Sequence, residues 1–141
     1  MERNEDQGPA GGITAHLTVR DNRAAEAIDF YKKAFGAEMA MGPHMADDGK
    51  RIMHVHLKLN GGSLMLNDDF PEFGHGAAQA PAGVTLHLQV KDADAAWNRA
   101  MEAGAKERFP LADQFWGDRY GQVTDPFGFT WSIGAPSAKA R

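Results

Sequence analysis

The sequence predicts an α+β fold built from two tandem βαβββ modules. Three observations support this prediction: apolar and polar residues alternate in several short segments, two longer segments carry apolar residues at helical spacing, and one pattern occurs twice along the chain. Alternation with a period of two is typical of half-buried strands, and a period near 3.6 is typical of amphipathic helices. We therefore expect eight strands and two helices.

Length and composition limit the possible functions. The chain has 141 residues, of which 43% are hydrophobic and 24% are charged, as expected for one domain or two small modules that share a core. The net charge of −4 and the lack of a Lys/Arg run argue against nucleic acid or an anionic membrane as a partner. There is no cysteine, which excludes disulfides and thiolate metal sites. Without an apolar signal sequence, a cytoplasmic location is expected.

The first module is predicted to span residues 13–67, after a mobile arm at residues 1–12. Its first strand has Ile13, Ala15, Leu17 and Val19 on one face, and Asp21 or Asn22 should cap a helix that ends at Gly36. Three strands follow. The predicted segments are Ala37–Met45, Ile52–Leu59 with Met53, Val55, Leu57 and Leu59 inward, and Ser63–Asn67 after a turn at Asn60-Gly61-Gly62.

The second module is predicted to span residues 84–134, after a linker at residues 68–83 in which Asp68 and Asp69 are solvated, and before a frayed tail at residues 135–141. Its first strand begins at Val84, and Asp92 should cap a helix that ends at Gly104. A short strand then leads to a hairpin closed by Asp125-Pro126-Phe127-Gly128. Trp97 and Trp131 are expected in the core.

An internal repeat supports the two modules most strongly. The motif Thr14-x-His16-Leu17-x-Val19-x-Asp21 returns 71 positions later as Thr85-x-His87-Leu88-x-Val90-x-Asp92. Each copy leads into a helix that ends in Gly-Ala and finishes with a turn and a strand. Self-similarity over this distance predicts a duplicated supersecondary unit.

These features resemble the vicinal oxygen chelate superfamily, which includes glyoxalase I, bleomycin-resistance proteins and extradiol dioxygenases. Two stretches are similar to a branch found in phosphonate-utilisation operons and labelled demethylubiquinone methyltransferase-like: Ile28–Glu38, and Phe115–Gly121 together with Asp125–Gly128. The resemblance covers about residues 13–134. It implies an eight-stranded cup with the helices outside, in a homodimer.

In metal-dependent members, the resemblance places the ligands at four inward positions, which fall on Thr14, Met65, Thr85 and Ser132. None of these is a histidine or a carboxylate, and hydroxyl and thioether groups are poor ligands for a divalent ion. We therefore expect no metal at these positions and no cofactor, and assign the four residues to ligand contacts instead.

Histidines add polar groups to the same faces. His16 and His87 are related by the repeat, and His54 and His56 alternate on a neighbouring strand. They are candidate ligand-binding or acid–base groups, with His87 and His16 the catalytic candidates, because an imidazole titrates near neutral pH. A polar lining without catalysis, or a metal held by three of these histidines, remains an alternative.

Arg119 and Trp116 complete the candidate site. A guanidinium can bind a carboxylate or phosphonate with two parallel hydrogen bonds, and an indole can form an apolar wall. An ion pair of Arg119 with Asp118 or Asp125 is the structural alternative. Two functions remain open: a binding protein for a small polar or anionic ligand, and a metal- or histidine-dependent lyase, isomerase or dioxygenase-like enzyme.

Overall fold

The computed structural model describes residues 8–74 and 76–138. Its contacts divide the described chain into two compact units, one formed by residues 8–32 and 36–79 and the other by residues 33–35 and 80–138. We call them module 1 and module 2. Most of the predicted mobile arm, residues 1–7, lies outside the described residues, as do residues 139–141 of the predicted tail.

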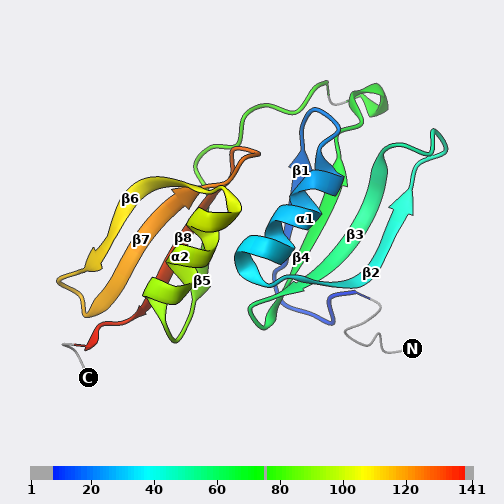
Figure 1. Cartoon of the computed structure of the whole chain (residues 1–141). Helices are drawn as coiled ribbons and strands as arrows, with labels where there is room; N and C mark the ends of the chain where they lie inside the picture. Colours follow the sequence, from blue (N-terminus) through cyan, green and yellow to red (C-terminus); the bar gives the residue numbers. More distant parts are fainter. Residues whose placement is uncertain (1–7, 75, 139–141) are drawn as a thin grey trace. The chain divides into compact units, whose positions relative to one another are not determined.

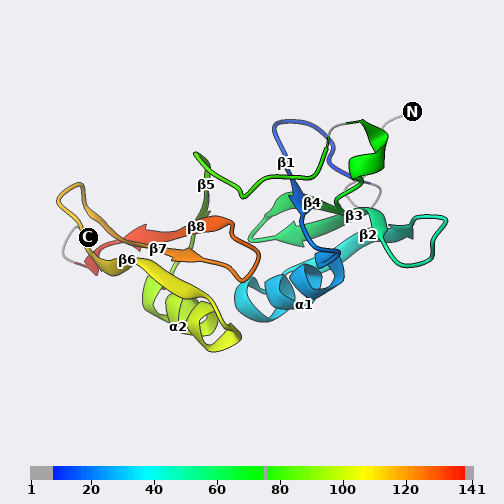
Figure 2. The ribbon, with the colours of Figure 1, turned by 90° about the horizontal axis from the view of Figure 1, so that it is seen from above.

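Module 1 has the predicted order of strand, helix and three strands, and its helix lies against one face of its sheet (Figures 1 and 2). The sheet order is β1-β4-β3-β2, with β1 parallel to β4 and the other pairs antiparallel. The elements are β1 (Ala15–Val19), α1 (Ala24–Phe35), β2 (Glu38–Met45), β3 (Ile52–Leu59) and β4 (Gly62–Asp68).

Module 2 repeats this topology, and its helix also covers one face of its own sheet (Figures 1 and 2). The sheet order is β5-β8-β7-β6, again with a parallel pair between its first and last strands. A short 3₁₀ helix, η1 (Pro71–Phe73), precedes the module. The elements are β5 (Thr85–Gln89), α2 (Ala93–Ala103), β6 (Lys106–Asp113), β7 (Asp118–Thr124) and β8 (Thr130–Pro136). The predicted α+β fold is confirmed.

Each core lies between a helix and one face of its sheet. In module 1, Val55, Leu57 and Leu66 are fully buried, as the alternation predicts. In module 2 the predicted core residues Trp97 and Trp131 are buried. The predicted hairpin turn is also confirmed, because the buried Asp125 carboxylate accepts hydrogen bonds from the backbone N–H groups of Phe127 and Phe129 and from the Trp131 indole.

The two helices begin differently. Asp92 caps α2 as predicted, accepting a hydrogen bond from the Ala95 backbone N–H at 3.0 Å. Neither Asp21 nor Asn22 caps α1; both adopt positive φ in the turn before it. The Ala24 N–H at the start of α1 donates instead to Oδ1 of Asp68, at the end of β4.

The prediction that Asp68 is a solvated loop charge is therefore wrong. Its side chain is buried, and Oδ2 accepts a second hydrogen bond, at 2.7 Å, from the backbone N–H of Ile52. Because burial strips water from a carboxylate, these two backbone donors replace the lost solvation.

Three apolar residues predicted to face inward are exposed. Ile13 and Val84 are related by the repeat, and both lie before the strand that they were expected to begin. Strand β1 begins two residues after Ile13 and β5 begins one residue after Val84, so neither side chain packs against its helix. Met53 is 44% exposed while its neighbour Ile52 is buried, because the β2–β3 register shifts at this end of the pair. An irregular register breaks the simple alternation of faces.

In the described residues, neither helix has the length and apolar character needed to cross a bilayer.

Candidate functional site

Each sheet has an open face, defined as the face opposite its helix. In β1, Leu17 and Val19 are buried against α1, whereas His16 and Thr18 point the other way and are exposed. Within each sheet, strand pairing places one residue from every strand in a row across the open face. The rows that contain His16 and His87 are related by the repeat. The His16 row runs His16, Met65, His56 and Met41, and the His87 row runs His87, Ser132, Gln122 and Phe109.

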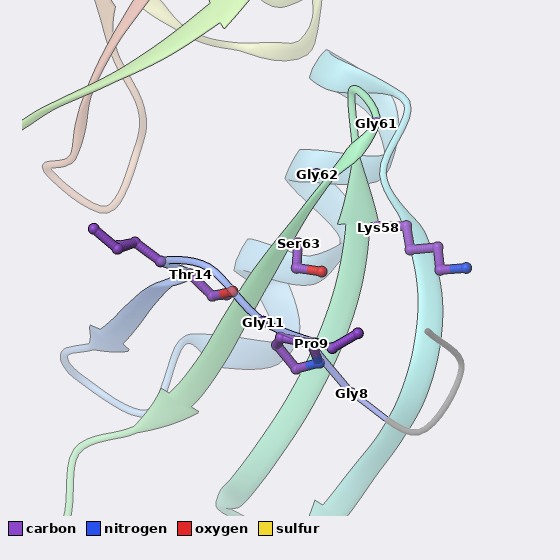
Figure 3. A pocket seen from close by; sticks show the side chains of 10 residues that line it. Gly8, Pro9, Gly11, Thr14, Lys58, Gly61, Gly62 and Ser63 are labelled. Atoms are coloured by element: carbon purple, nitrogen blue, oxygen red, sulfur yellow. The ribbon is translucent and has the colours of Figure 1, made fainter. Parts of the chain in front are cut away.

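Module 1 contains a pocket of about 390 Å³ at one end of its open face. Figure 3 shows residues 8–11 of the N-terminal segment running across the strands, next to the side chains of Thr14 and Ser63. Lys58 also lines the pocket, and its side chain extends away from the two hydroxyl residues in this view. The full lining is Gly8, Pro9, Ala10, Gly11, Ile13, Thr14, Lys58, Gly61, Gly62 and Ser63.

A buried histidine supports the floor of this pocket. His56 is completely buried, and its Nε2 lies 2.8 Å from Oγ of Ser63. The pair joins the His16 row to the pocket, because Ser63 also faces Lys58 across the β3–β4 ladder. Sequence analysis placed His56 on the polar face; the structure adds that its ring is held by a pocket residue.

The other histidines of module 1 form a looser group. The rings of His16 and His54 meet edge to face with centroids 6.1 Å apart, and those of His54 and His44 stack at 6.3 Å. His16 has no hydrogen-bond partner among the described residues and is exposed. Its imidazole nitrogens are therefore accessible to solvent or to a ligand.

His87 in module 2 is held on both sides. Its Nδ1 lies 2.7 Å from Oγ of Ser132 and its Nε2 lies 2.8 Å from Oε1 of Gln89. An amide oxygen only accepts, so Nε2 carries a proton and donates to Gln89. In the neutral ring, Nδ1 then accepts a hydrogen bond from the Ser132 hydroxyl. This arrangement fixes one tautomer, and both ring nitrogens are occupied.

Aromatic side chains surround His87. Its ring stacks on Tyr120 with centroids 5.9 Å apart, and Tyr120 meets Trp116 at 5.7 Å. Trp116 is 50% exposed, and its indole N–H donates to Asp118. The aromatic wall predicted for Trp116 therefore exists as a cluster on module 2; its role in ligand binding stays a prediction.

Arg119 lies in an ion-pair network. Its guanidinium donates to both carboxylate oxygens of Asp94, at 3.0–3.2 Å, and to Asp113 at 3.3 Å. These partners differ from the predicted Asp118 and Asp125. Hydrogen bonds from the cation to Asp94 raise the pKa of Arg119 above its usual value. Arg119 alternates with the open-face residues Tyr120 and Gln122, so the geometry does not favour an anion-binding role.

The four positions to which the resemblance assigns metal ligands carry residues that do not suit a metal. Thr14 and Met65 offer a hydroxyl and a thioether in module 1, while Thr85 is exposed and the Ser132 hydroxyl is engaged by His87 in module 2. These are weak ligands for a divalent ion. Among residues 8–74 and 76–138, no group of three His, Asp or Glu side chains has a metal-binding arrangement.

The pocket itself was not predicted. The alternation of β3 does place Lys58 on the polar face, and the hairpin turn supplies Gly61 and Gly62. Sequence analysis assigned residues 8–12 to a mobile arm, however, and no local pattern indicates that this segment packs beside Thr14 and Ser63. Only the tertiary arrangement brings the two together.

Comparison with known proteins identifies the family. The model of the Glyoxalase/Bleomycin resistance protein/Dioxygenase superfamily matches residues 13–133, and the chain belongs to that superfamily. The uncharacterized protein Mb0911c of Mycobacterium bovis is 48% identical over 129 residues, which cover 88% of this chain and 82% of that protein.

Solved structures share the fold. The X-ray structure of the At5g48480 gene product from Arabidopsis thaliana has a TM-score of 0.68 and 32% identity, covering 87% of this chain and 97% of that one. A Bacillus cereus structure described as a putative 3-demethylubiquinone-9 3-methyltransferase, PhnB protein, has a TM-score of 0.69 over 89% and 99% of the two chains. At 20% identity it shows the fold alone.

Proposed function

We propose that the protein binds a small polar organic molecule in the pocket of module 1. The observation that carries this proposal is the pocket itself, about 390 Å³ in volume, on a polar sheet face. This volume lies within the range of roughly 300–1,000 Å³ that is typical of small-molecule sites. Hydroxyl groups of Thr14 and Ser63 would orient a polar ligand by hydrogen bonds.

Binding without turnover is the favoured activity. A catalyst needs a group that moves a proton or activates an oxygen, and the metal positions carry residues that are poorly suited to this. His87, one of the two predicted catalytic histidines, has both nitrogens engaged by Ser132 and Gln89. The ligand would therefore be held and released unchanged.

One observation favours the alternative of a histidine-dependent enzyme. His16 lies two residues beyond Thr14 on the same strand face, and its nitrogens have no hydrogen-bond partner in the described part of the chain. An accessible imidazole next to a pocket can act as a general acid or base. Turnover therefore has to be measured alongside binding.

A ligand screen by thermal shift tests the site, with two repeat-related variants. Thr14→Leu fills the pocket of module 1, and Thr85→Leu makes the same change on β5. Compounds that raise the melting temperature of the wild type should lose their effect in Thr14→Leu and keep it in Thr85→Leu. Loss in Thr85→Leu alone would contradict the assignment to module 1.

Mass spectrometry of each bound compound then separates binding from catalysis. We expect every hit to be recovered unchanged after prolonged incubation with the protein. Conversion of a hit that is abolished by His16→Asn would establish the enzyme alternative instead.

We also propose that the chain forms a homodimer. Each four-stranded sheet ends in two strands with a single hydrogen-bonded neighbour, and exposed edge strands favour association. Light scattering should give twice the monomer mass of 15.3 kDa at micromolar concentration. A monomer mass at all these concentrations would contradict it.

A further inference from the structure

Two of the described histidines form hydrogen bonds with serine hydroxyls, and the two pairs differ in accessibility. In module 1, Nε2 of His56 lies 2.8 Å from Oγ of Ser63, and in module 2, Nδ1 of His87 lies 2.7 Å from Oγ of Ser132. Ser132 is only 1% exposed, whereas Ser63 is half-buried and lines the pocket. Of these two hydroxyl groups, that of Ser63 is the one that a ligand can reach.

The contact between His56 and Ser63 has the geometry of a base and a nucleophile. A serine hydroxyl is a weak nucleophile until a base takes its proton, and the base must lie within about 2.6–3.2 Å of the hydroxyl oxygen. The distance of 2.8 Å between Nε2 and Oγ falls in this range. Proton transfer requires the tautomer in which Nδ1 carries the imidazole proton, so that Nε2 accepts from the hydroxyl.

Burial holds this base in place. The side chain of His56 is completely buried, so bulk water does not compete with the Ser63 hydroxyl for Nε2. A hydrogen bond is also electrostatically stronger where the local dielectric constant is low. The base is therefore positioned beside the hydroxyl before any ligand binds.

The pocket leaves room for an organic group next to Ser63. A Cβ atom added at Gly11 or Gly61 would meet no heavy atom within 4 Å, and one at Gly62 would make only an ordinary contact with a backbone carbonyl. The side chain of Thr14 lies beside Ser63 in the same pocket (Figure 3). Its hydroxyl can donate to a carbonyl oxygen and stabilise the negative charge that develops there when the carbonyl carbon is attacked.

We propose that Ser63 is a nucleophile that accepts the acyl group of a small ester or thioester, with His56 as its general base. The inference rests on the proposed function, because the ester binds in the same pocket, and it adds a covalent step for this one class of ligand. Ligands without an ester or thioester bond are released unchanged.

The reaction is a transfer of the acyl group to the protein. Oγ of Ser63 forms a bond with the carbonyl carbon of the ester, while the hydroxyl proton passes to Nε2 of His56. The bond from this carbon to the alcohol or thiol then breaks, and the departing group takes the proton from His56. The products are an acyl-serine and a free alcohol or thiol. Because His56 is buried, water reaches it slowly, and the acyl-serine should accumulate.

The ester p-nitrophenyl acetate tests this reaction, because it is small and its leaving group is coloured. The wild type should release one equivalent of p-nitrophenol per chain in a rapid burst, and tandem mass spectrometry should locate one acetyl group on Ser63. Ser63→Ala should lose both the burst and the acetyl group. The matched control is Thr130→Ala, which removes a hydroxyl from the start of β8, the strand of module 2 that corresponds to β4, and it should keep the burst.

His56→Gln tests the role of the base. Loss of a general base should slow the acetylation of Ser63 at least about a hundredfold. A compound from the ligand screen that still binds this variant would show that the pocket is intact. Nitrogen-15 spectra of the wild type provide a readout that needs no substrate, and they should show the imidazole proton of His56 on Nδ1. A ring with its proton on Nε2 would overturn the assignment.

The outcomes separate this inference from the proposed function. Acetyl groups found on lysine side chains alone, or equal bursts in the wild type and Ser63→Ala, would overturn the nucleophile while leaving the small-molecule site in place. If Ser63 is not acetylated and no screened compound raises the melting temperature, the proposed function itself fails as well.

Discussion

The two modules share a topology but treat their repeat-related histidines in opposite ways. Both side chains are exposed, but His87 is hydrogen-bonded through both ring nitrogens, whereas His16 makes an edge-to-face contact with the His54 ring and no hydrogen bond among the described residues. The neighbours on the last strand of each module explain part of the difference. Ser132 offers His87 a hydroxyl, but the corresponding Met65 offers His16 a thioether, which is a weak acceptor.

The space beneath each ring explains the rest of the difference between His87 and His16. Gly134 lies beneath the His87 ring, and a Cβ added there would come within 2.9 Å of Cε1 of His87. The corresponding residue of module 1 is Asn67, whose amide accepts a hydrogen bond from Thr18 instead. A duplicated position can therefore become a fixed structural group in one copy and an accessible one in the other through changes in its neighbours alone.

The largest difference between the two modules is expected at the N-terminal ends of their helices, where different carboxylates accept the first backbone hydrogen bonds. Asp68→Ala removes a buried acceptor from two backbone N–H groups, those of Ala24 and Ile52, and should lower the free energy of unfolding by about 3 kcal/mol. Asp92→Ala removes an exposed local cap from α2 and should cost only about 1 kcal/mol. Urea denaturation of both variants measures the difference, and equal losses would contradict it.

Substitution of Gly121 tests how closely strand β7 packs against Trp97 and Leu111 in module 2. An added Cβ would lie 2.7 Å from the Trp97 ring and 2.8 Å from two backbone atoms of Leu111, so the strand itself would have to move. Gly121→Ala should lower the free energy of unfolding by about 1–3 kcal/mol, as overpacking typically does. The control is Gly62→Ala in module 1, where the nearest atom is 3.6 Å away. A Gly121→Ala protein as stable as this control would show that β6 moves without cost.

Gly134→Ala addresses the histidine comparison directly. The new methyl group should displace the His87 ring and break its contacts with Ser132 and Gln89, at a cost of about 1 kcal/mol. Nitrogen-15 spectra should then show that His87 exchanges between tautomers, as expected for a ring whose nitrogens are no longer held by hydrogen bonds. The His16 signals serve as the internal reference, and a His87 spectrum identical to that of the wild type would refute the role of Gly134.

The smallest effect is expected from the ion pairs that Arg51 of module 1 makes with Asp48 and Glu72. Hydrogen bonds to Asp48 from the backbone N–H groups of Arg51 and Lys50, and then from the Arg51 guanidinium, lower the pKa of Asp48 to about 2. The folded pKa is below the ordinary value of 3.8, so this stabilisation is present above that value and is lost as the pH falls towards 2.

A pH series of urea denaturations on wild type and Asp48→Asn checks this expectation. The difference in the free energy of unfolding should stay constant from pH 8 to pH 5 and should shrink between about pH 4 and pH 2. Asp47→Asn, at the exposed neighbouring position, controls for the change in net charge. A difference that does not depend on pH would contradict the assignment.

The sequence predicts what depends on local pattern. Alternation identified the buried face of Val55 and Leu57, and the repeat identified the two modules. The family was anticipated only as a resemblance and is shown by the matching family model. Interactions between distant segments escaped prediction. Asp68 was predicted to be a loop charge because its partners, Ala24 and Ile52, are far away along the chain. Ile13 was predicted to lie in the core because an alternating pattern does not show where strand pairing begins.

The candidate site was predicted in part for the same reason. The polar faces and their histidines follow from a period of two, so His16, His54, His56 and His87 were identified correctly as residues of these faces. Whether a histidine is fixed by hydrogen bonds depends on the hydroxyl of Ser63 or Ser132 and on the missing Cβ of Gly134. Which face carries a pocket depends on residues 8–11 near the N-terminus. None of these leaves a periodic signal.

The Arg51 network also affects how the two modules are tethered. Arg51 binds Glu72 through two hydrogen bonds and lies 4.2 Å from the centre of the Phe70 ring, and Asp69 accepts a hydrogen bond from the Ala78 backbone. These contacts hold the start of the connection against module 1, so that the segment that joins the two modules is shorter than the full stretch from residue 68 to residue 83. A shorter tether raises the effective concentration of one module around the other. Loss of Arg51 would therefore reduce the rate at which the modules encounter each other during folding, although Arg51 belongs to neither sheet core.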